Sequence, residues 1–166
     1  MQVGPDSIFI TGGARSGKSQ WAETLAKESG RAVIYLATMP RIASDHELDE
    51  RIDRHSKRRP SHWRTVEEAL MPERVIANLA CQEPTLVLLD CLSLYVSNLL
   101  LSGSYALYSM ENAQVQRELE ENLLEEVEDL LAVMSVAGNL SKNKNLSFIL
   151  VSNEVGSGIV PDNHLA

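Results

Sequence analysis

The stretch FITGGARSGKSQWAE, residues 9–23, joins a short apolar run to an amphipathic one through a turn rich in glycine and serine. Within it, residues 12–19 fit the pattern G-x-x-x-x-G-K-[ST]. Glycines at these positions let the backbone curl, so that successive amides point at one anion. A helix that starts after the turn directs its positive end at the same anion. The stretch therefore predicts a phosphate-binding loop between a strand and a helix.

The predicted nucleotide-binding loop consists of Gly12, Gly13, Ala14, Arg15, Ser16, Gly17, Lys18 and Ser19. We expect the Lys18 ammonium to reach the β- and γ-phosphates of a nucleoside triphosphate, and the Ser19 hydroxyl to bind Mg²⁺. Arg15 either contacts phosphate or faces solvent. The alternative is a turn that is merely rich in glycine. The position of this stretch between a strand-like run and a helix favours the nucleotide-binding interpretation.

Asp90 is an acid that directly follows another apolar run, the four aliphatic residues 86–89. Proteins with a P-loop hold Mg²⁺ partly through an acid at the end of a nearby strand. Core packing explains an aspartate in this place poorly. We therefore expect Asp90 to lie on the Mg²⁺ side of the site. Capping of the following helix is the alternative role, and one residue can serve both.

Four short apolar runs without clean alternation predict strands at residues 7–11, 32–38, 85–92 and 146–153. Helical patterns lie between them, at residues 17–29, 44–60, 92–101 and 110–137, with Gly30 and Gly138 as expected stops. This succession predicts an α/β fold: a P-loop NTPase-like, three-layer domain with a mostly parallel central sheet. The 166 residues suit one such domain, and no linker divides them.

The composition of the chain excludes some classes of binding partner and indicates a cellular compartment. A net charge of −8 argues against a general nucleic-acid binder. No apolar run reaches the roughly 18 residues of a membrane span, and no secretory leader is expected. Cys81 and Cys91 lie on or beside apolar runs and are predicted to be buried free thiols in a reducing compartment, so we expect a cytoplasmic protein.

A histidine on the predicted basic helix is the second candidate for chemistry. His55 has Arg51, Arg58 and Arg59 at helical spacing around it. Such cations would keep the imidazole neutral and would hold a polyphosphate beside it. A neutral imidazole can then attack phosphorus. A partly buried histidine under the apolar stripe of the helix is the alternative.

Five segments together resemble one family: ITGGARSGKS (10–19), IYLAT (34–38), DERIDRHSKRRPSHWRTVEE (49–68), LVLLDCLSLYVSNLL (86–100) and VSNEVGSGIVPDN (151–163). The chain resembles the bifunctional adenosylcobinamide kinase / adenosylcobinamide-phosphate guanylyltransferase family of cobalamin synthesis. The P-loop is generic, whereas the blocks around His55 and after Asn153 are specific to the family.

The resemblance implies two reactions. A nucleoside triphosphate, ATP or GTP, phosphorylates adenosylcobinamide, and GTP then transfers GMP through a guanylylated histidine to adenosylcobinamide phosphate. The motif match assigns that histidine to His55, while Lys18, Arg51, Arg58 and Arg59 are candidates to hold the leaving pyrophosphate. A homo-oligomer, a trimer in particular, is also implied. Relatives of this kind continue past Ala166, so we expect the chain as given to lack a C-terminal helix and strand.

Two other functions stay open at this point. In a simple P-loop small-molecule kinase, His55 would be structural and no nucleotide would become covalently attached. An inactive nucleotide-binding module would bind nucleotide without turnover.

Overall fold

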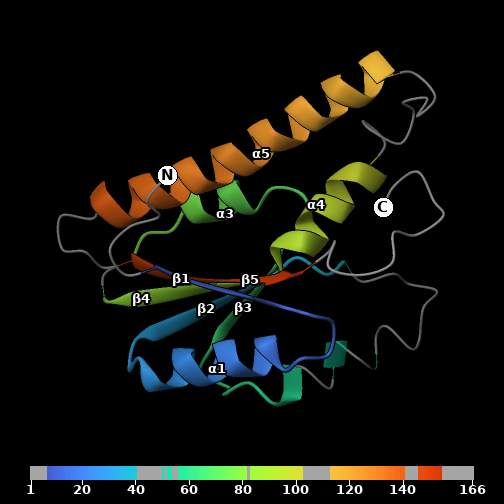
Figure 1. The fold of residues 1–166 in the computed structure, drawn as a ribbon. Helices are drawn as coiled ribbons and strands as arrows, with labels where there is room; N and C mark the ends of the chain where they lie inside the picture. The colour runs from blue at the N-terminus through green and yellow to red at the C-terminus, as the bar shows by residue number, and fades with distance from the viewer. Residues whose placement is uncertain are drawn as a thin grey trace.

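The computed structural model describes residues 7–40, 50, 52–53, 56–81, 83–102, 113–140 and 146–154. The described chain contains five strands and four helices, which follow one another as mixed α/β elements (Figure 1). In chain order they are β1 (Ser7–Gly12), α1 (Lys18–Glu28), β2 (Ala32–Ala37), β3 (Arg64–Glu67), α3 (Pro72–Ala77), β4 (Thr85–Asp90), α4 (Leu92–Leu101), α5 (Ala113–Leu140) and β5 (Leu146–Asn153).

The five described strands form one sheet in the order β1-β5-β4-β2-β3, and every pairing is parallel. Their carboxyl ends therefore meet at one edge. Gly12 lies opposite Asn153 in the register, and Asp90 lies opposite both Val151 and Ala37. This arrangement brings the predicted phosphate-binding loop and Asp90 to the same edge, with β5 between them.

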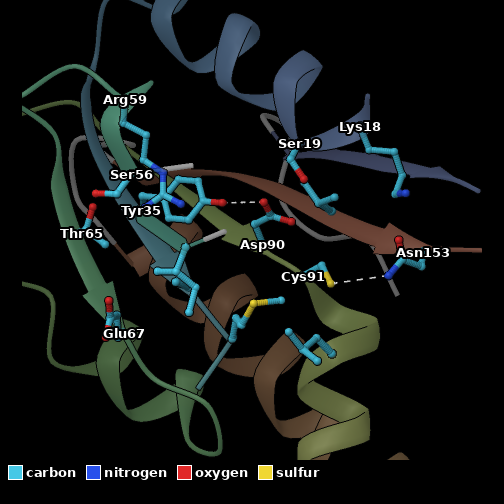
Figure 2. A pocket seen from close by; sticks show the side chains of 15 residues that line it. Lys18, Ser19, Tyr35, Ser56, Arg59, Thr65, Glu67, Asp90, Cys91 and Asn153 are labelled. Carbon is cyan, nitrogen blue, oxygen red and sulfur yellow. Dashed lines mark hydrogen bonds between the residues drawn. The ribbon is translucent and has the colours of Figure 1, made fainter. Parts of the chain in front are cut away.

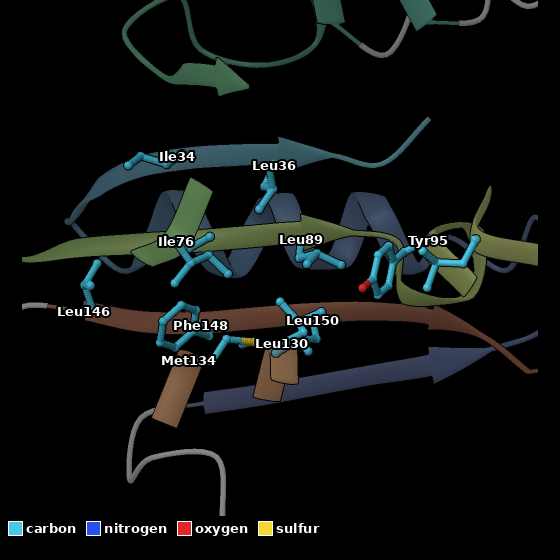
Figure 3. Close-up of a cluster of buried hydrophobic side chains, with 12 residues drawn as sticks. Ile34, Leu36, Ile76, Leu89, Tyr95, Leu130, Met134, Leu146, Phe148 and Leu150 are labelled. Atoms are coloured by element: carbon cyan, nitrogen blue, oxygen red, sulfur yellow. The ribbon is translucent and has the colours of Figure 1, made fainter. Parts of the chain in front are cut away.

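Helices cover both faces of the sheet, which confirms the predicted three-layer α/β fold. Helix α1 lies against one face, and α3, α4 and α5 lie against the other (Figure 1). On the α5 side, Phe148 and Leu150 of β5 pack with Leu130 and Met134 of α5 (Figure 3). Because both faces are covered, β2, β4 and β5 are buried along nearly their whole length. This explains why their sequences are continuously apolar.

Two short elements have no counterpart among the sequence predictions. Strand β3 has four residues with mostly exposed side chains, and α3 has six residues. Neither length carries a readable period. Hydrogen bonding to the edge of β2 defines β3, so it depends on tertiary pairing rather than on an apolar run.

The predicted helix boundaries are confirmed at α4 and nearly so at α1, where Gly17 is the N-cap and Gly30 is left-handed with φ 65°. The predicted stop at Gly138 is wrong, because α5 continues to Leu140. A Cβ at Gly138 would lie 3.8 Å from the Phe148 ring, an ordinary contact, so this position of the helix faces β5 without being crowded. A glycine inside a helix costs only about 1 kcal/mol relative to alanine, too little to end a helix of 28 residues by itself. The predicted helix over 44–60 is helical at its described residues 50, 52–53 and 56–57.

Candidate nucleotide-binding site

The glycine-rich loop connects β1 to α1, as its sequence predicts. Gly17 has φ 88° and Arg15 has φ 58°, both in the left-handed region. Gly12 accepts a hydrogen bond at its carbonyl oxygen from the Glu154 N–H, at 3.0 Å, which fixes the start of the loop against the end of β5. A Cβ on Gly12 would lie 3.2 Å from Ser16 Oγ. A side chain at position 12 would therefore force Ser16 to shift, and glycine suits the left-handed backbone at position 17.

Lys18 and Ser19 begin α1 at the carboxyl edge of the sheet. Lys18 is buried, with 9% of its surface exposed. Its Nζ donates a 2.7 Å hydrogen bond to the carbonyl oxygen of Gly13. The ammonium thus bends back over the loop, where it can exchange this carbonyl for a phosphate oxygen.

A cavity of about 210 Å³ opens beside this loop (Figure 2). Its charged and polar lining includes Lys18, Ser19, Arg59, Glu67, Asp90 and Asn153. Its apolar lining includes Ala37, Met39, Ile52, Leu94 and Val151. Four residues singled out in the sequence therefore line one cavity, although they come from three separate parts of the chain. Arg15 and Arg58 are not among the lining residues.

Asp90 is the last residue of β4, and its carboxylate faces this cavity. Cys91, not Asp90, is the N-cap of α4, and no side chain caps that helix. The alternative role of Asp90 as a helix cap is therefore wrong. Its Oδ2 instead accepts a 2.5 Å hydrogen bond from the Tyr35 hydroxyl (Figure 2).

Tyr35 joins Asp90 to Arg59. The Arg59 guanidinium carbon lies 3.3 Å from the centroid of the Tyr35 ring, a cation–π contact. Burial raises the pKa of Tyr35 well above its usual value, and the Asp90 carboxylate raises it further, whereas Arg59 lowers it. The phenol therefore stays protonated at neutral pH, as the donor that Asp90 requires.

Mg²⁺ suits the donors present here. Among the described residues there is no group of three or more His, Cys, Asp or Glu side chains that could hold a metal ion. Mg²⁺ does not need such a group, because it usually keeps several waters and takes one or two carboxylates plus substrate phosphates. The Ser19 hydroxyl and the Asp90 carboxylate both line this cavity and supply oxygens of that kind.

The predicted histidine site is only partly described. His55 and Arg51 lie outside the described residues. Arg58 lies beside α1, with its Nη2 3.6 Å from Glu23 Oε1.

Sequence reasoning assigned no role to Tyr35, Thr65 or Glu67, which also line the cavity. A phenol inside an apolar strand was a usable signal for Tyr35, because a buried tyrosine hydroxyl usually has a partner. Thr65 and Glu67 gave no such signal, because they belong to the unpredicted strand β3.

The loop, the parallel sheet and the strand-end acid define a P-loop nucleotide-binding protein. One solved structure, an ATPase from a bacterial type III secretion system, shares the fold with a TM-score of 0.59 at 12% identity. The match covers 95% of this chain and 46% of that chain. None of the described helices is both long and apolar enough to cross a membrane.

The model of the family described as cobinamide kinase / cobinamide phosphate guanyltransferase matches residues 8–166. The bifunctional adenosylcobalamin biosynthesis protein CobP of Pseudomonas aeruginosa is 41% identical, over 92% of this chain and 74% of that protein. CobU of Escherichia coli, which carries the same description, is 37% identical over 96% and 81%. The chain therefore belongs to this family of bifunctional transferases of adenosylcobalamin biosynthesis.

Proposed function

We propose that this chain phosphorylates adenosylcobinamide with a nucleoside triphosphate and then converts the product to adenosylcobinamide-GDP with GTP. The proposal rests on one observation, that four residues line the same cavity: Lys18, Ser19, Arg59 and Asp90. It combines the cations that triphosphate binding requires with the hydroxyl and carboxylate that suit Mg²⁺. Family membership supports the choice of substrate.

In the kinase step, the substrate hydroxyl attacks the γ-phosphorus and the nucleoside diphosphate leaves. This chemistry depends mainly on positioning and charge neutralisation. Lys18 would hold the β- and γ-phosphates, and Ser19 and Asp90 would hold Mg²⁺ directly or through water. The bound Mg²⁺ would neutralise charge that develops on the phosphate oxygens.

In the transferase step, we propose that His55 attacks the α-phosphorus of GTP. A P–N bond forms, the bond to pyrophosphate breaks, and GMP remains on the imidazole. A phosphate oxygen of adenosylcobinamide phosphate then attacks the same phosphorus and frees the histidine. Ile52 and Ser56, three residues before and one residue after His55, line the cavity, which supports placing the histidine at the nucleotide. The proposed cations for the leaving pyrophosphate are Lys18, Arg51, Arg58 and Arg59, of which Lys18 and Arg59 line the described cavity.

The test uses GTP labelled on the α-phosphorus, incubated with protein and Mg²⁺ before denaturation. We expect the protein to retain label that is acid-labile and base-stable, and His55→Ala to retain none. His62→Ala is the matched control and should retain the label, because His62 is a nearby exposed histidine with no proposed role. GTP labelled on the γ-phosphorus should leave none. A GTP-binding protein that retains no α-label would favour the simple kinase. Binding without turnover in either assay would favour the inactive module.

We also propose that the protein is a cytoplasmic homo-oligomer, with a trimer as the expected state. Light scattering coupled to size-exclusion chromatography measures the mass directly. A monomeric mass near 18.4 kDa would contradict the proposal.

A further inference from the structure

Tyr35 contacts two groups of opposite charge that line the nucleotide cavity. Its hydroxyl donates a hydrogen bond to Asp90, and its ring lies under the guanidinium of Arg59 (Figure 2). The tyrosine comes from β2, Asp90 from the end of β4, and Arg59 from the segment before β3. One side chain therefore bridges three separate parts of the chain.

The sheet register explains why the hydroxyl reaches the carboxylate. Tyr35 pairs with Leu88, and Asp90 comes two residues after Leu88 on the same strand. Side chains two residues apart point to the same face, so Tyr35 and Asp90 are diagonal neighbours across parallel strands. The strands themselves are held in register at this point, because the Thr38 N–H donates to the Asp90 carbonyl oxygen at 3.2 Å.

The guanidinium of Arg59 packs on the ring of Tyr35. Among the described residues, the Arg59 Nε is buried without a hydrogen-bond partner. Its guanidinium carbon lies 3.3 Å from the centroid of the Tyr35 ring, and both residues line the cavity. A buried guanidinium donor without a partner carries a desolvation cost, which an anion in the cavity would relieve.

We propose that Tyr35 is a positioning residue of the nucleotide site, with its hydroxyl fixing the Asp90 carboxylate and its ring fixing the Arg59 guanidinium. This inference rests on the proposed function, because it assumes that Mg²⁺ and a triphosphate bind in this cavity. The hydroxyl donates to Oδ2 of Asp90, which would leave Oδ1 free to hold Mg²⁺ or its bound water. The ring keeps the guanidinium from turning to bulk solvent before the triphosphate arrives.

Two substitutions separate these roles. Tyr35→Phe removes the hydrogen bond to Asp90 and keeps the ring under Arg59. Tyr35→Leu removes both contacts and keeps an apolar side chain in the strand. A purely structural role for Tyr35 would change the thermal stability of the variants without changing how their nucleotide affinity depends on Mg²⁺.

The experiment measures GTP affinity by calorimetry in EDTA and across a Mg²⁺ titration. For Tyr35→Phe we expect the Mg²⁺ concentration for half-maximal tightening to rise about tenfold, from the loss of one hydrogen bond to a charged group. Its affinity in EDTA should stay within about twofold of the wild type, because the cation–π contact remains. For Tyr35→Leu we expect the affinity in EDTA to fall about fivefold as well.

A double-mutant cycle provides the control. On the Arg59→Ala background, Tyr35→Leu should cause no further loss of affinity in EDTA, because its effect passes through Arg59. Wild-type Mg²⁺ dependence in a folded Tyr35→Phe protein would overturn the inference and leave the proposed function intact. If the wild-type protein itself shows no Mg²⁺-dependent GTP binding, the proposed function fails, and this inference fails with it.

Discussion

The carboxylate of Glu23 lies 3.6 Å from the guanidinium of Arg58. Glu23 belongs to α1, the helix that follows the phosphate-binding loop, and Arg58 comes three residues after His55. The contact therefore joins the nucleotide loop's helix to the segment that carries the proposed nucleophile. The two side chains differ in burial, because that of Glu23 is 3% exposed and that of Arg58 is 43% exposed.

This difference in burial predicts unequal costs for the two halves of the ion pair. Arg58→Ala should lower the free energy of unfolding by about 1–3 kcal/mol, because it leaves a buried carboxylate without its cation. Glu23→Gln should cost less, because the half-exposed Arg58 stays hydrated. Urea unfolding measures both, and Glu23→Gln should recover part of the loss when it is added to Arg58→Ala. Equal costs, or full additivity, would contradict this account.

Gly17→Ala should lower the free energy of unfolding by about 1–2 kcal/mol, because Gly17 has a φ of 88° that side chains rarely adopt. Space is not the reason, since an added Cβ would meet no atom within 4 Å. Gly13→Ala is the matched control. Gly13 has the same free space and no positive φ, so this variant should unfold like the wild type without nucleotide. A loss as large in Gly13→Ala would remove backbone strain as the explanation.

Thr38→Val should destabilise the protein by about 1–3 kcal/mol. The Thr38 side chain is fully buried, and its hydroxyl donates to the Cys91 carbonyl oxygen at 2.8 Å and accepts from the Cys91 N–H at 2.9 Å. Valine keeps the volume but leaves both backbone groups without this partner. Thr38→Ser keeps the hydroxyl and should cost about 1 kcal/mol, for one lost methyl group. Thermal unfolding would refute the interpretation if serine proved the worse substitution.

Glu73→Gln should stabilise the protein more at pH 7 than at pH 4. Desolvation by burial raises the pKa of Glu73 above its ordinary value of 4.5, and the nearby Glu126 raises it further. A carboxyl whose pKa is raised in the folded state makes its full contribution to the free energy of unfolding below pH 4.5, where it is neutral in both states. That contribution is lost as the pH rises through the folded-state pKa, and glutamine avoids the loss. Denaturant unfolding at the two pH values should show the difference, and a benefit that is constant with pH would count against it.

The fold could be predicted where the sequence carried a strong local signal. Four of the five described strands and the helices α1, α4 and α5 were predicted within a few residues, because buried parallel strands require continuous apolar runs. Strand β3 was missed because hydrogen bonds to β2, rather than its own side chains, create it. Gly138 was misread as a stop because a single glycine is a weak signal, and α5 continues through it to Leu140.

Some residues of the candidate site could also be predicted from local sequence, whereas others could not. The loop and Asp90 were predicted because their chemistry requires particular residue types at fixed places beside strands. Tyr35 escaped notice because its partners, Asp90 and Arg59, lie 55 and 24 residues further along the chain.

The sequence alone determined the α/β class and the phosphate-binding loop, since glycine conformations, the helix start and the burial of apolar runs all act over a few neighbouring residues. The tertiary structure alone decided which charged side chains share the cavity. The strand order places β5 between β1 and β4, and the register of β2 on β4 brings the Tyr35 hydroxyl to Asp90. These relationships depend on pairing between distant segments, which no local pattern records.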